Sequence, residues 1–225
     1  MDGYQYNWDV VWQSLPELRQ GLIITLQVSI VGMALAVVFG LLCAIARLSQ
    51  YGYLRKISIV IIDFSRSIPL FVLLFWVYYG LSLKFSINLT AFQAGAIALG
   101  ITGGAYMAEV FRGGINAVDF GQREAALAIG LTQAKAFNLV VFPQAIRIII
   151  PQAVNVYVGL LKGATIVSVI GVADMIYVAQ YVSLNSFTPF EMYSAVGVAF
   201  IALTVSIAGL AYLLEKRLNR GRSRG

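Results

Sequence analysis

The sequence predicts an all-α integral membrane protein with about five transmembrane helices, its N-terminus outside and its C-terminus inside. Apolar residues make up 60% of the 225 residues and charged residues 12%, whereas soluble domains carry roughly 25% charged residues. The apolar residues gather in runs long enough to cross a bilayer, which takes about 20 residues. Short connections separate these runs, so we expect a single transmembrane domain over residues 1–225.

The first and third spans carry small residues at helical spacing. Gly32, Ala36 and Gly40 recur every four residues in the first span, and Gly100 and Gly104 do so in the third. Small side chains on one helical face allow another helix to approach closely. The five spans are expected at about residues 21–46, 67–83, 91–110, 149–172 and 193–214.

The second span is less regular than the others. Residues 57–66 form an amphipathic lead-in, in which Asp63 and Arg66 are spaced to pair at i, i+3. Pro69 follows, and we expect it in the first turn of the span, where its missing N–H does little harm. The span is therefore expected to begin near Ser67.

The 16 lysine and arginine residues are distributed unevenly over the connections. The connection 47–56 holds three, the segment 112–147 four and the C-terminal tail five, whereas the opposite side holds Arg19 and Lys84. Basic residues are enriched in cytoplasmic loops. The distribution therefore predicts that residues 111–148 and the basic, glycine-rich tail lie in the cytosol. It also explains the net charge of +6 without a nucleic-acid partner.

The chain lacks the residues that several classes of function require. The chain has no histidine, so no histidine-based metal or acid–base site is available, and we predict no catalytic and no metal-binding residue. No phosphate-binding glycine-rich loop of the nucleotide-hydrolysing type occurs. Cys43 lies alone in an apolar run and is expected to be a small packed residue. The N-terminal segment is polar and acidic, so we expect no cleavable signal peptide.

Residues 123–147 form the longest segment that is neither an apolar span nor a short connection. Glu124, Ala125 and Ala126 begin a helix of small residues, Gly130 permits a turn, and Pro143 is expected to end the segment. We predict two short helices joined at Gly130. The pattern alone leaves two readings open: an amphipathic element lying against the membrane, or a helix pair that docks into a partner.

The same residues resemble the EAA loop of permease subunits of bacterial ATP-binding-cassette importers, and the chain resembles the polar amino acid permeases among them. The resemblance is carried by several stretches in order, at residues 21–32, 64–81, 103–131, 142–155 and 160–175. It implies the permease fold of type I importers in the bacterial cytoplasmic (inner) membrane. It also implies that the loop couples to an ATPase through Glu124, Ala125, Ala126, Gly130, Leu131 and Pro143.

The resemblance further implies the partners. These are two ATPase subunits that bind ATP and Mg, a second permease subunit (identical or paralogous) and an extracytoplasmic solute-binding protein. The chain itself is expected to bind an amino acid substrate and the lipid bilayer but no cofactor. ATP binding by the partners would shift the helix pairs as levers and switch the pathway from inward facing to outward facing.

Lys162 lies about halfway along the fourth span. A charged lysine at a helix centre costs about 2.5–3.5 kcal/mol on insertion scales, so it is expected to face protein or water. It either pairs with an acid of another span, or extends to the interface, or contributes to the solute pathway. Val156, Leu160 and Gly163 share one helical face, and in similar permeases this face lines the central cavity together with the region of Thr102.

Many relatives carry an acidic residue directly after this lysine, whereas here Gly163, Ala164 and Thr165 follow. We therefore expect an acidic or neutral polar amino acid, or an amino-acid-like solute, rather than a simple cationic one. Arg66 either pairs with Asp63 and caps helix ends or meets substrate. The predicted pathway residues are Arg66, Thr102, Tyr106, Asn155, Val156, Leu160, Lys162, Gly163 and Thr165.

Two other classes of function compete with this interpretation. An ATPase-independent secondary transporter or channel would favour titratable relays inside the membrane, and the spans offer few beyond Lys162. A membrane-embedded enzyme would need a catalytic set of residues at matched depth, and none is present. We therefore expect a transport subunit, with ATP hydrolysis carried out by a separate subunit.

Overall fold

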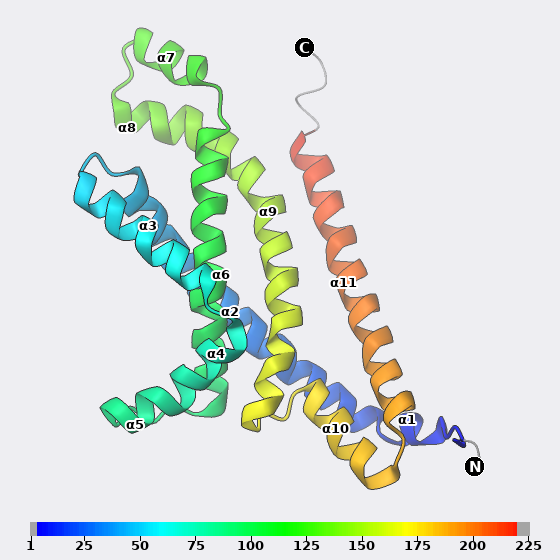
Figure 1. Ribbon diagram of the computed structural model, residues 1–225. Helices are drawn as coiled ribbons and strands as arrows, with labels where there is room; N and C mark the ends of the chain where they lie inside the picture. The colour runs from blue at the N-terminus through cyan, green and yellow to red at the C-terminus, as the bar shows by residue number, and fades with distance from the viewer. Residues whose placement is uncertain (1–3, 220–225) are drawn as a thin grey trace.

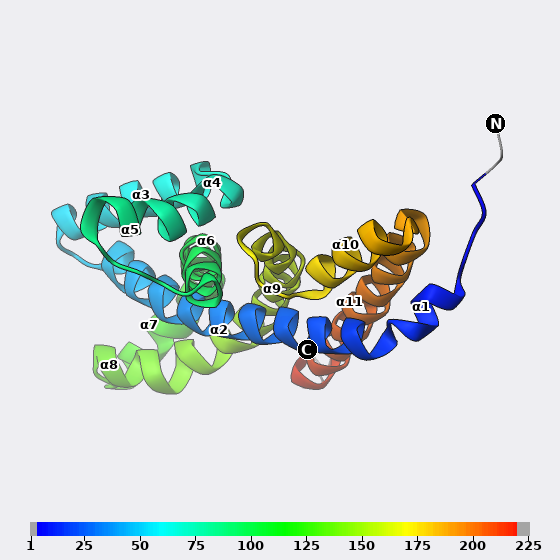
Figure 2. The same cartoon turned by 90° about the horizontal axis from the view of Figure 1, so that it is seen from below.

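The computed structural model describes residues 4–219, and these residues fold into helices without a β-strand (Figure 1). Residues 1–3 and 220–225 lie outside the described part, and with them Arg220, Arg222 and Arg224 of the basic tail. After the short α1 (Asp9–Gln13), the long helix α2 (Leu15–Leu48) runs obliquely along the molecule and contacts α6, α9 and α10 (Figures 1 and 2). The fold is therefore organised around α2.

Helix α2 packs most extensively against α6 (Ala91–Asn116). A Cβ atom placed at Gly40 would lie 2.6 Å from the Cβ of Met107, and one placed at Gly100 would lie 2.6 Å from the Cβ of Leu35. The backbones approach so closely because these positions have no side chain. The prediction of close packing at the small residues of the first and third spans is confirmed, and Ala36 is fully buried between them.

The chain bends sharply at the predicted start of the second span, between the amphipathic lead-in and the apolar run that begins at Leu70. Helix α3 (Gly52–Ser67) ends before Pro69, and a second arm follows, consisting of α4 (Leu70–Phe75), the π-helical turn η1 (Trp76–Gly80) and α5 (Leu81–Phe85). The helix direction bends by 101° between the two arms. Ile68 and Pro69 are extended, because the proline ring disfavours a helical conformation of the residue before it.

Neither arm alone is long enough to cross a bilayer. In the described residues, four helical segments have the length and apolarity of a span: Leu15–Leu48, Ala91–Asn116, Gln133–Ile170 and Pro189–Arg217. A fifth is obtained only when the bent pair counts as one span. The prediction of five spans thus depends on how this broken segment sits in the membrane.

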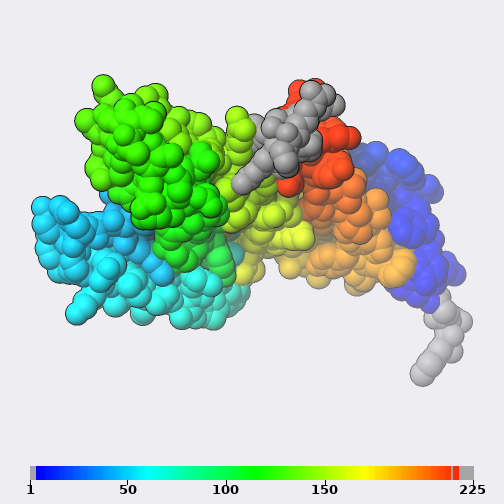
Figure 3. All heavy atoms as spheres, turned by 90° about the horizontal axis from the view of Figure 1, so that it is seen from above, coloured from blue at the N-terminus to red at the C-terminus, as the bar shows by residue number. Residues whose placement is uncertain are grey.

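Helix α7 (Phe120–Ala128) and helix α8 (Gln133–Ala136) stand together at one end of the molecule, beyond the end of α6 (Figure 1). Seen from that end, they form an exposed lobe at one side, with α11 at the other (Figure 3). Helix α8 continues through the π-helical turn η2 (Phe137–Val141) into α9 (Phe142–Gly163) and the 3₁₀ segment η3 (Ala164–Ile170).

This continuity corrects the expectation that Pro143 ends the helix, and the predicted start of the fourth span near residue 149 lies inside a longer helix. A proline inside a helix lacks an N–H donor, and its ring presses on the preceding turn. The wide π-helical turn η2 ends directly before Phe142 and Pro143, and it supplies the room that the ring needs. The helix therefore passes through Pro143 instead of stopping there.

The opposite end of the molecule is built from η3, α10 (Met175–Ser186) and the start of α11 (Pro189–Asn219). The N-terminal segment joins this end, because the Tyr4 hydroxyl and the Asn7 N–H both donate hydrogen bonds to the carboxylate of Glu191. Glu191 is fully buried. These bonds tie the first described residues to the last long helix.

Candidate functional site

A hollow of about 440 Å³ lies between α4, α6 and α9. The structure brings most of the predicted pathway residues together in its wall. Leu70 and Leu99 complete the lining, with Gly159. The predicted residues that line the hollow are Thr102, Tyr106, Asn155, Val156, Leu160 and Gly163.

Gly163 keeps the hollow open at its narrow side. A Cβ atom at this position would lie 3.1 Å from the Cδ2 atom of Leu70 and 3.4 Å from that of Leu99. Any side chain here would therefore press on the wall of the hollow. Gly159, one turn earlier, has no atom within 4 Å of its ideal Cβ position and leaves the hollow accessible.

The polar groups of the wall are neutral hydrogen-bonding groups. The Thr102 hydroxyl is buried and has no hydrogen-bond partner in the structure. A buried hydroxyl without a partner is costly, so its partner is expected to be a water or a ligand. Asn155 and Tyr106 add an amide and a phenol, and the wall contains no carboxylate and no lysine or arginine. Such a wall can hydrogen-bond a polar solute without neutralising a cationic one.

Three predicted pathway residues lie outside the wall of the hollow. The Arg66 guanidinium lies 5.4 Å from the ring centroid of Tyr106, which does line it. Such a distance allows a cation–π interaction. Thr165 uses its hydroxyl to donate a hydrogen bond to the carbonyl oxygen of Lys162 at 2.8 Å. Arg66 therefore reaches the hollow only through an aromatic side chain.

The two membrane-depth cations are not paired as one reading of the sequence expected. Within residues 4–219, no carboxylate lies within 4.0 Å of Arg66 or Lys162, so the pair between Asp63 and Arg66 does not form. Lys162 is exposed on the surface of α9. An acid from another span of this chain is thus not its partner.

An ion cluster that the sequence did not predict joins α2 to α6. Glu109 accepts hydrogen bonds from Arg47 at the end of α2 and, at 2.8 and 2.9 Å, from Arg112. The pair of Glu109 and Arg112 has an i, i+3 spacing that a sequence can reveal. The contact with Arg47 spans 62 residues, and nothing in the local pattern announces it.

The turn at Gly130 joins α7 to α8 as the sequence predicted. Gly130 has a φ of +87°, a conformation that side chains disfavour, and its ideal Cβ position meets no atom within 4 Å. Its N–H donates to the carbonyl oxygen of Leu127, and the N–H of Leu131 donates to that of Ala126. The side chains of Asp119 and Thr132 cap the N-termini of α7 and α8.

The helix pair exposes most of its α7 side chains. Glu124 and Ala125 are exposed, Ala126 is buried against the rest of the chain, and Ile129 at the tip is 79% exposed. Pro143 lies beyond the pair, in the first turn of α9. The unit thus presents small residues, a carboxylate and an exposed apolar tip away from the spanning helices.

Asp174 forms a buried junction at the other end of the molecule, between the end of the span at Ile170 and α10. Its Oδ1 atom accepts from the N–H of Tyr177, and its Oδ2 atom is buried without a partner. Burial raises the pKa of this carboxyl to about 7. The start of α10 also meets α2, because the Thr25 hydroxyl accepts from the Met175 N–H.

Comparison with known proteins identifies a family whose members resemble this chain. Residues 36–220 match the family described as "Binding-protein-dependent transport system inner membrane component". A "Probable amino-acid permease protein YxeN" of Bacillus subtilis (strain 168) is 35% identical over 95% of this chain and 96% of its own length. A "Glutamine transport system permease protein GlnP" of Escherichia coli (strain K12) is 31% identical over 95% of this chain and 98% of its own length.

Solved structures resemble the chain over nearly its whole length. The "Crystal structure of an amino acid ABC transporter with histidines" contains a chain that is 35% identical, with a TM-score of 0.90, over 95% of this chain and all of that one. A chain of the inward-facing MetNI methionine ABC transporter has a TM-score of 0.78 at 19% identity, over 92% of this chain and 99% of that one. The second likeness concerns the fold alone.

Proposed function

Because this chain belongs to the family of binding-protein-dependent transport system inner membrane components, we propose that it lines the pathway of an ATP-driven amino acid importer and couples to a separate ATPase through α7 and α8. Its relatives include amino acid ABC transporter permeases, and its fold is that of type I importer permeases. The proposed partners are two ATPase subunits that bind ATP and Mg, a second permease and an extracytoplasmic solute-binding protein.

The observation that carries the proposal is the continuous helix from α8 to η3. It begins in the exposed pair at Gln133 and reaches the hollow at Val156, Leu160 and Gly163. A rigid helix moves as a unit, so a displacement of the pair by a partner would move the wall of the hollow. Coupling at one end and solute contact at the other therefore need no further linking element.

We propose that α7 and α8 lie in the cytosol of a bacterial cell, beneath its inner membrane. The distribution of basic residues supports this orientation, since the connection 47–56, the segment 112–147 and the C-terminal tail together carry 12 of the 16 lysine and arginine residues. The N-terminal segment, α10 and the start of α11 would then face outward. A solute-binding protein would meet that outward end.

The coupling proposal can be tested at Gly130. A Gly130→Val variant forces a β-branched side chain into a conformation with φ of +87°, although the site itself has open space. We expect the variant to insert into membranes, to lose ATP-driven transport and to co-purify less ATPase. Gly209→Val is the matched control, because its position in α11 is also open and has no positive φ.

Transport that persists with full coupling in the Gly130 variant would contradict the assignment of the helix pair. Transport that continues without ATP and without any co-purifying ATPase would instead show an independent carrier or channel. Membrane insertion of the Gly130 variant at the level of the Gly209 control separates a loss of coupling from a failure of folding.

We propose that the solute is an acidic or neutral polar amino acid, or a solute like one. The wall of the hollow supports this proposal, since it offers the Thr102 hydroxyl, the Asn155 amide and the Tyr106 phenol but no carboxylate. The test is stimulation of ATP hydrolysis in the reconstituted complex by a panel of amino acids. A selective response to arginine or lysine would contradict it.

A further inference from the structure

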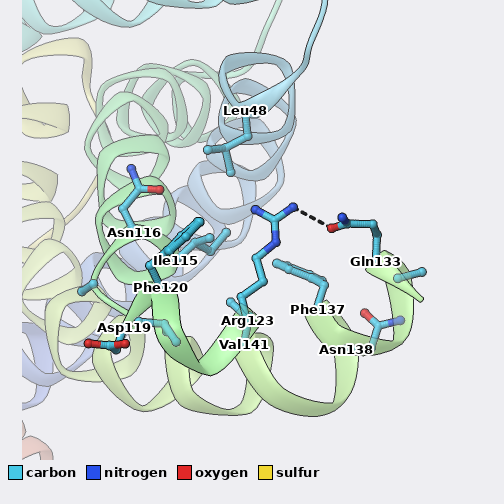
Figure 4. Close-up of a pocket in the computed structure, with 13 residues that line it drawn as sticks. Leu48, Ile115, Asn116, Asp119, Phe120, Arg123, Gln133, Phe137, Asn138 and Val141 are labelled. Carbon is cyan, nitrogen blue, oxygen red and sulfur yellow. Dashed lines mark hydrogen bonds between the residues drawn. The ribbon is translucent and has the colours of Figure 1, made fainter. Parts of the chain in front are cut away.

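A second hollow lies at the base of the helix pair, outside the proposed solute pathway. It has a volume of about 800 Å³ and separates α7, α8 and η2 from the ends of α2 and α6. Figure 4 shows Leu48 of α2 on one side, and Arg123 of α7 with Phe137 and Val141 of η2 on the other. The hollow is large enough for a ligand of moderate size.

The hollow lies where two spanning helices end. Leu48 is the last residue of α2, and Ile115 precedes the last residue of α6. The hollow is therefore at the level where lipid headgroups meet the protein. It faces the spanning helices, so a partner that docks on the outer side of the pair would leave it uncovered.

The wall of this hollow is apolar with one basic centre. Leu48, Ile115, Phe120, Phe137 and Val141 supply apolar surface. Phe120 is 68% exposed, so its ring is accessible to a ligand in the hollow. Such a wall suits the upper part of an acyl chain, since burial of apolar surface is the main source of binding free energy there.

Arg123 supplies the basic centre, and it lacks a charged partner. Its Nη2 atom donates a hydrogen bond to the Oε1 atom of Gln133 at 2.6 Å, and no carboxylate of the described residues lies within 4.0 Å of it. Asp119 also lines the hollow, but it accepts from the Gly121 N–H and points away from Arg123 in Figure 4. The guanidinium therefore keeps most of its donors for an anionic group.

We propose that this hollow binds a membrane phospholipid, with the phosphodiester on Arg123 and the first part of an acyl chain against Phe120 and Phe137. Basic pockets at the ends of spanning helices bind lipid headgroups through the same combination of charge and apolar wall. The lipid would fill the space beneath the helix pair and hold the pair at a fixed distance from α2. An ATPase that docks on the helix pair would then move the pair together with its bound lipid.

The test is native mass spectrometry of the full chain purified from membranes in mild detergent. We expect the wild type to retain one bound phospholipid. The lipid-bound fraction of Arg123→Gln should be lower by a factor of at least about five, since one basic residue near a lipid surface contributes about that factor to binding. Lys135→Gln is the matched control, because Lys135 is an exposed basic residue of α8 outside the lining. Equal retention in the wild type and the Arg123 variant would overturn the proposal.

A second measurement leaves Arg123 intact and so does not depend on the folding of that variant. A photoreactive phenylalanine derivative replaces Asn138, which lines the hollow, and the intact complex is irradiated in its membrane. We expect an adduct with the mass of a phospholipid. An adduct with a polypeptide would show that a partner subunit fills the hollow, and an adduct of neither kind would show that it binds only water or small ions; either result overturns the proposal.

Discussion

Replacement of Asp174 by asparagine should make the protein more stable at pH 8 and remove a pH dependence of its stability. Asp174 is fully buried, has no ion-pair partner in the described residues and leaves one carboxyl oxygen without a hydrogen bond. Burial in these surroundings disfavours the charged carboxylate. Asparagine keeps the oxygen that caps α10 through the Tyr177 N–H, and it carries no charge.

The size of the effect follows from the pKa of this carboxyl. The pKa rises from 3.8 to about 7, so the folded protein binds the proton more tightly than the unfolded chain. The free energy of unfolding is therefore highest below pH 3.8, falls as the pH rises toward about 7, and is constant above that. At about 1.4 kcal/mol per pKa unit, the full change is on the order of 4 kcal/mol.

The assay is thermal unfolding of the purified chain in detergent between pH 4 and pH 8. A change of about 4 kcal/mol corresponds to a shift in Tm of about 8 °C or more for a chain of this size. Asp119→Asn is the matched control, because Asp119 also caps a helix but is exposed. If the wild type and Asp174→Asn lose stability in parallel from pH 4 to pH 8, the reasoning is refuted.

Three further substitutions test the packing, the ion cluster and the hollow. Gly40→Ala should cost about 1–3 kcal/mol in thermal unfolding, because the new Cβ would lie 2.6 Å from that of Met107, and Gly197→Ala, at an open position, should cost much less. Glu109→Gln should lower stability by about 1–2 kcal/mol, since it leaves Arg47 without its ion-pair partner; unchanged unfolding would show that the cluster is too solvated to matter. Thr102→Val should leave unfolding unchanged and raise the transport KM about fivefold, because the hydroxyl has no partner within the protein, and an unchanged KM would remove Thr102 from the pathway.

The parts of the fold that follow from local geometry could be predicted from the sequence. The small residues of the first and third spans indicated a close approach, and Gly40 now lies against Met107. Gly130 indicated a turn, and its φ is positive. Both signals are local because each depends on the absence of a side chain at one position.

The two prolines show where local reasoning is insufficient. Pro69 follows a helix that ends, and Ile68 before it is extended. Pro143 has the same ring and the same missing N–H, yet the helix continues through it from a π-helical turn. Whether a proline breaks a helix depends on whether neighbouring packing stabilises a widened turn, and that is a property of the folded molecule.

Helical periodicity could predict the candidate site on α9 alone, whereas Thr102 and Tyr106 of α6 were expected there only through the family resemblance. The shared face of Val156, Leu160 and Gly163 follows from helical periodicity, and the hollow indeed lies on it. Arg66 of α3 lies over the ring of Tyr106 of α6, and no local sequence pattern predicts that these two helices are neighbours. The same holds for the contact between Arg47 and Glu109, because a sequence shows charge but not which helices become neighbours.

The hydrogen bonds to Glu191 have a consequence for the order in which the chain is made. Tyr4 and Asn7 precede their acceptor by 187 and 184 residues. While the ribosome makes the intervening helices, neither donor can form its bond to Glu191, because that carboxylate arrives with the last helix. The end of the molecule that holds α10 and the start of α11 can therefore reach its final structure only after synthesis of α11 is under way. A chain that places its last helix wrongly would leave a buried carboxylate without donors, so the first residues of the chain favour the correct insertion of the last.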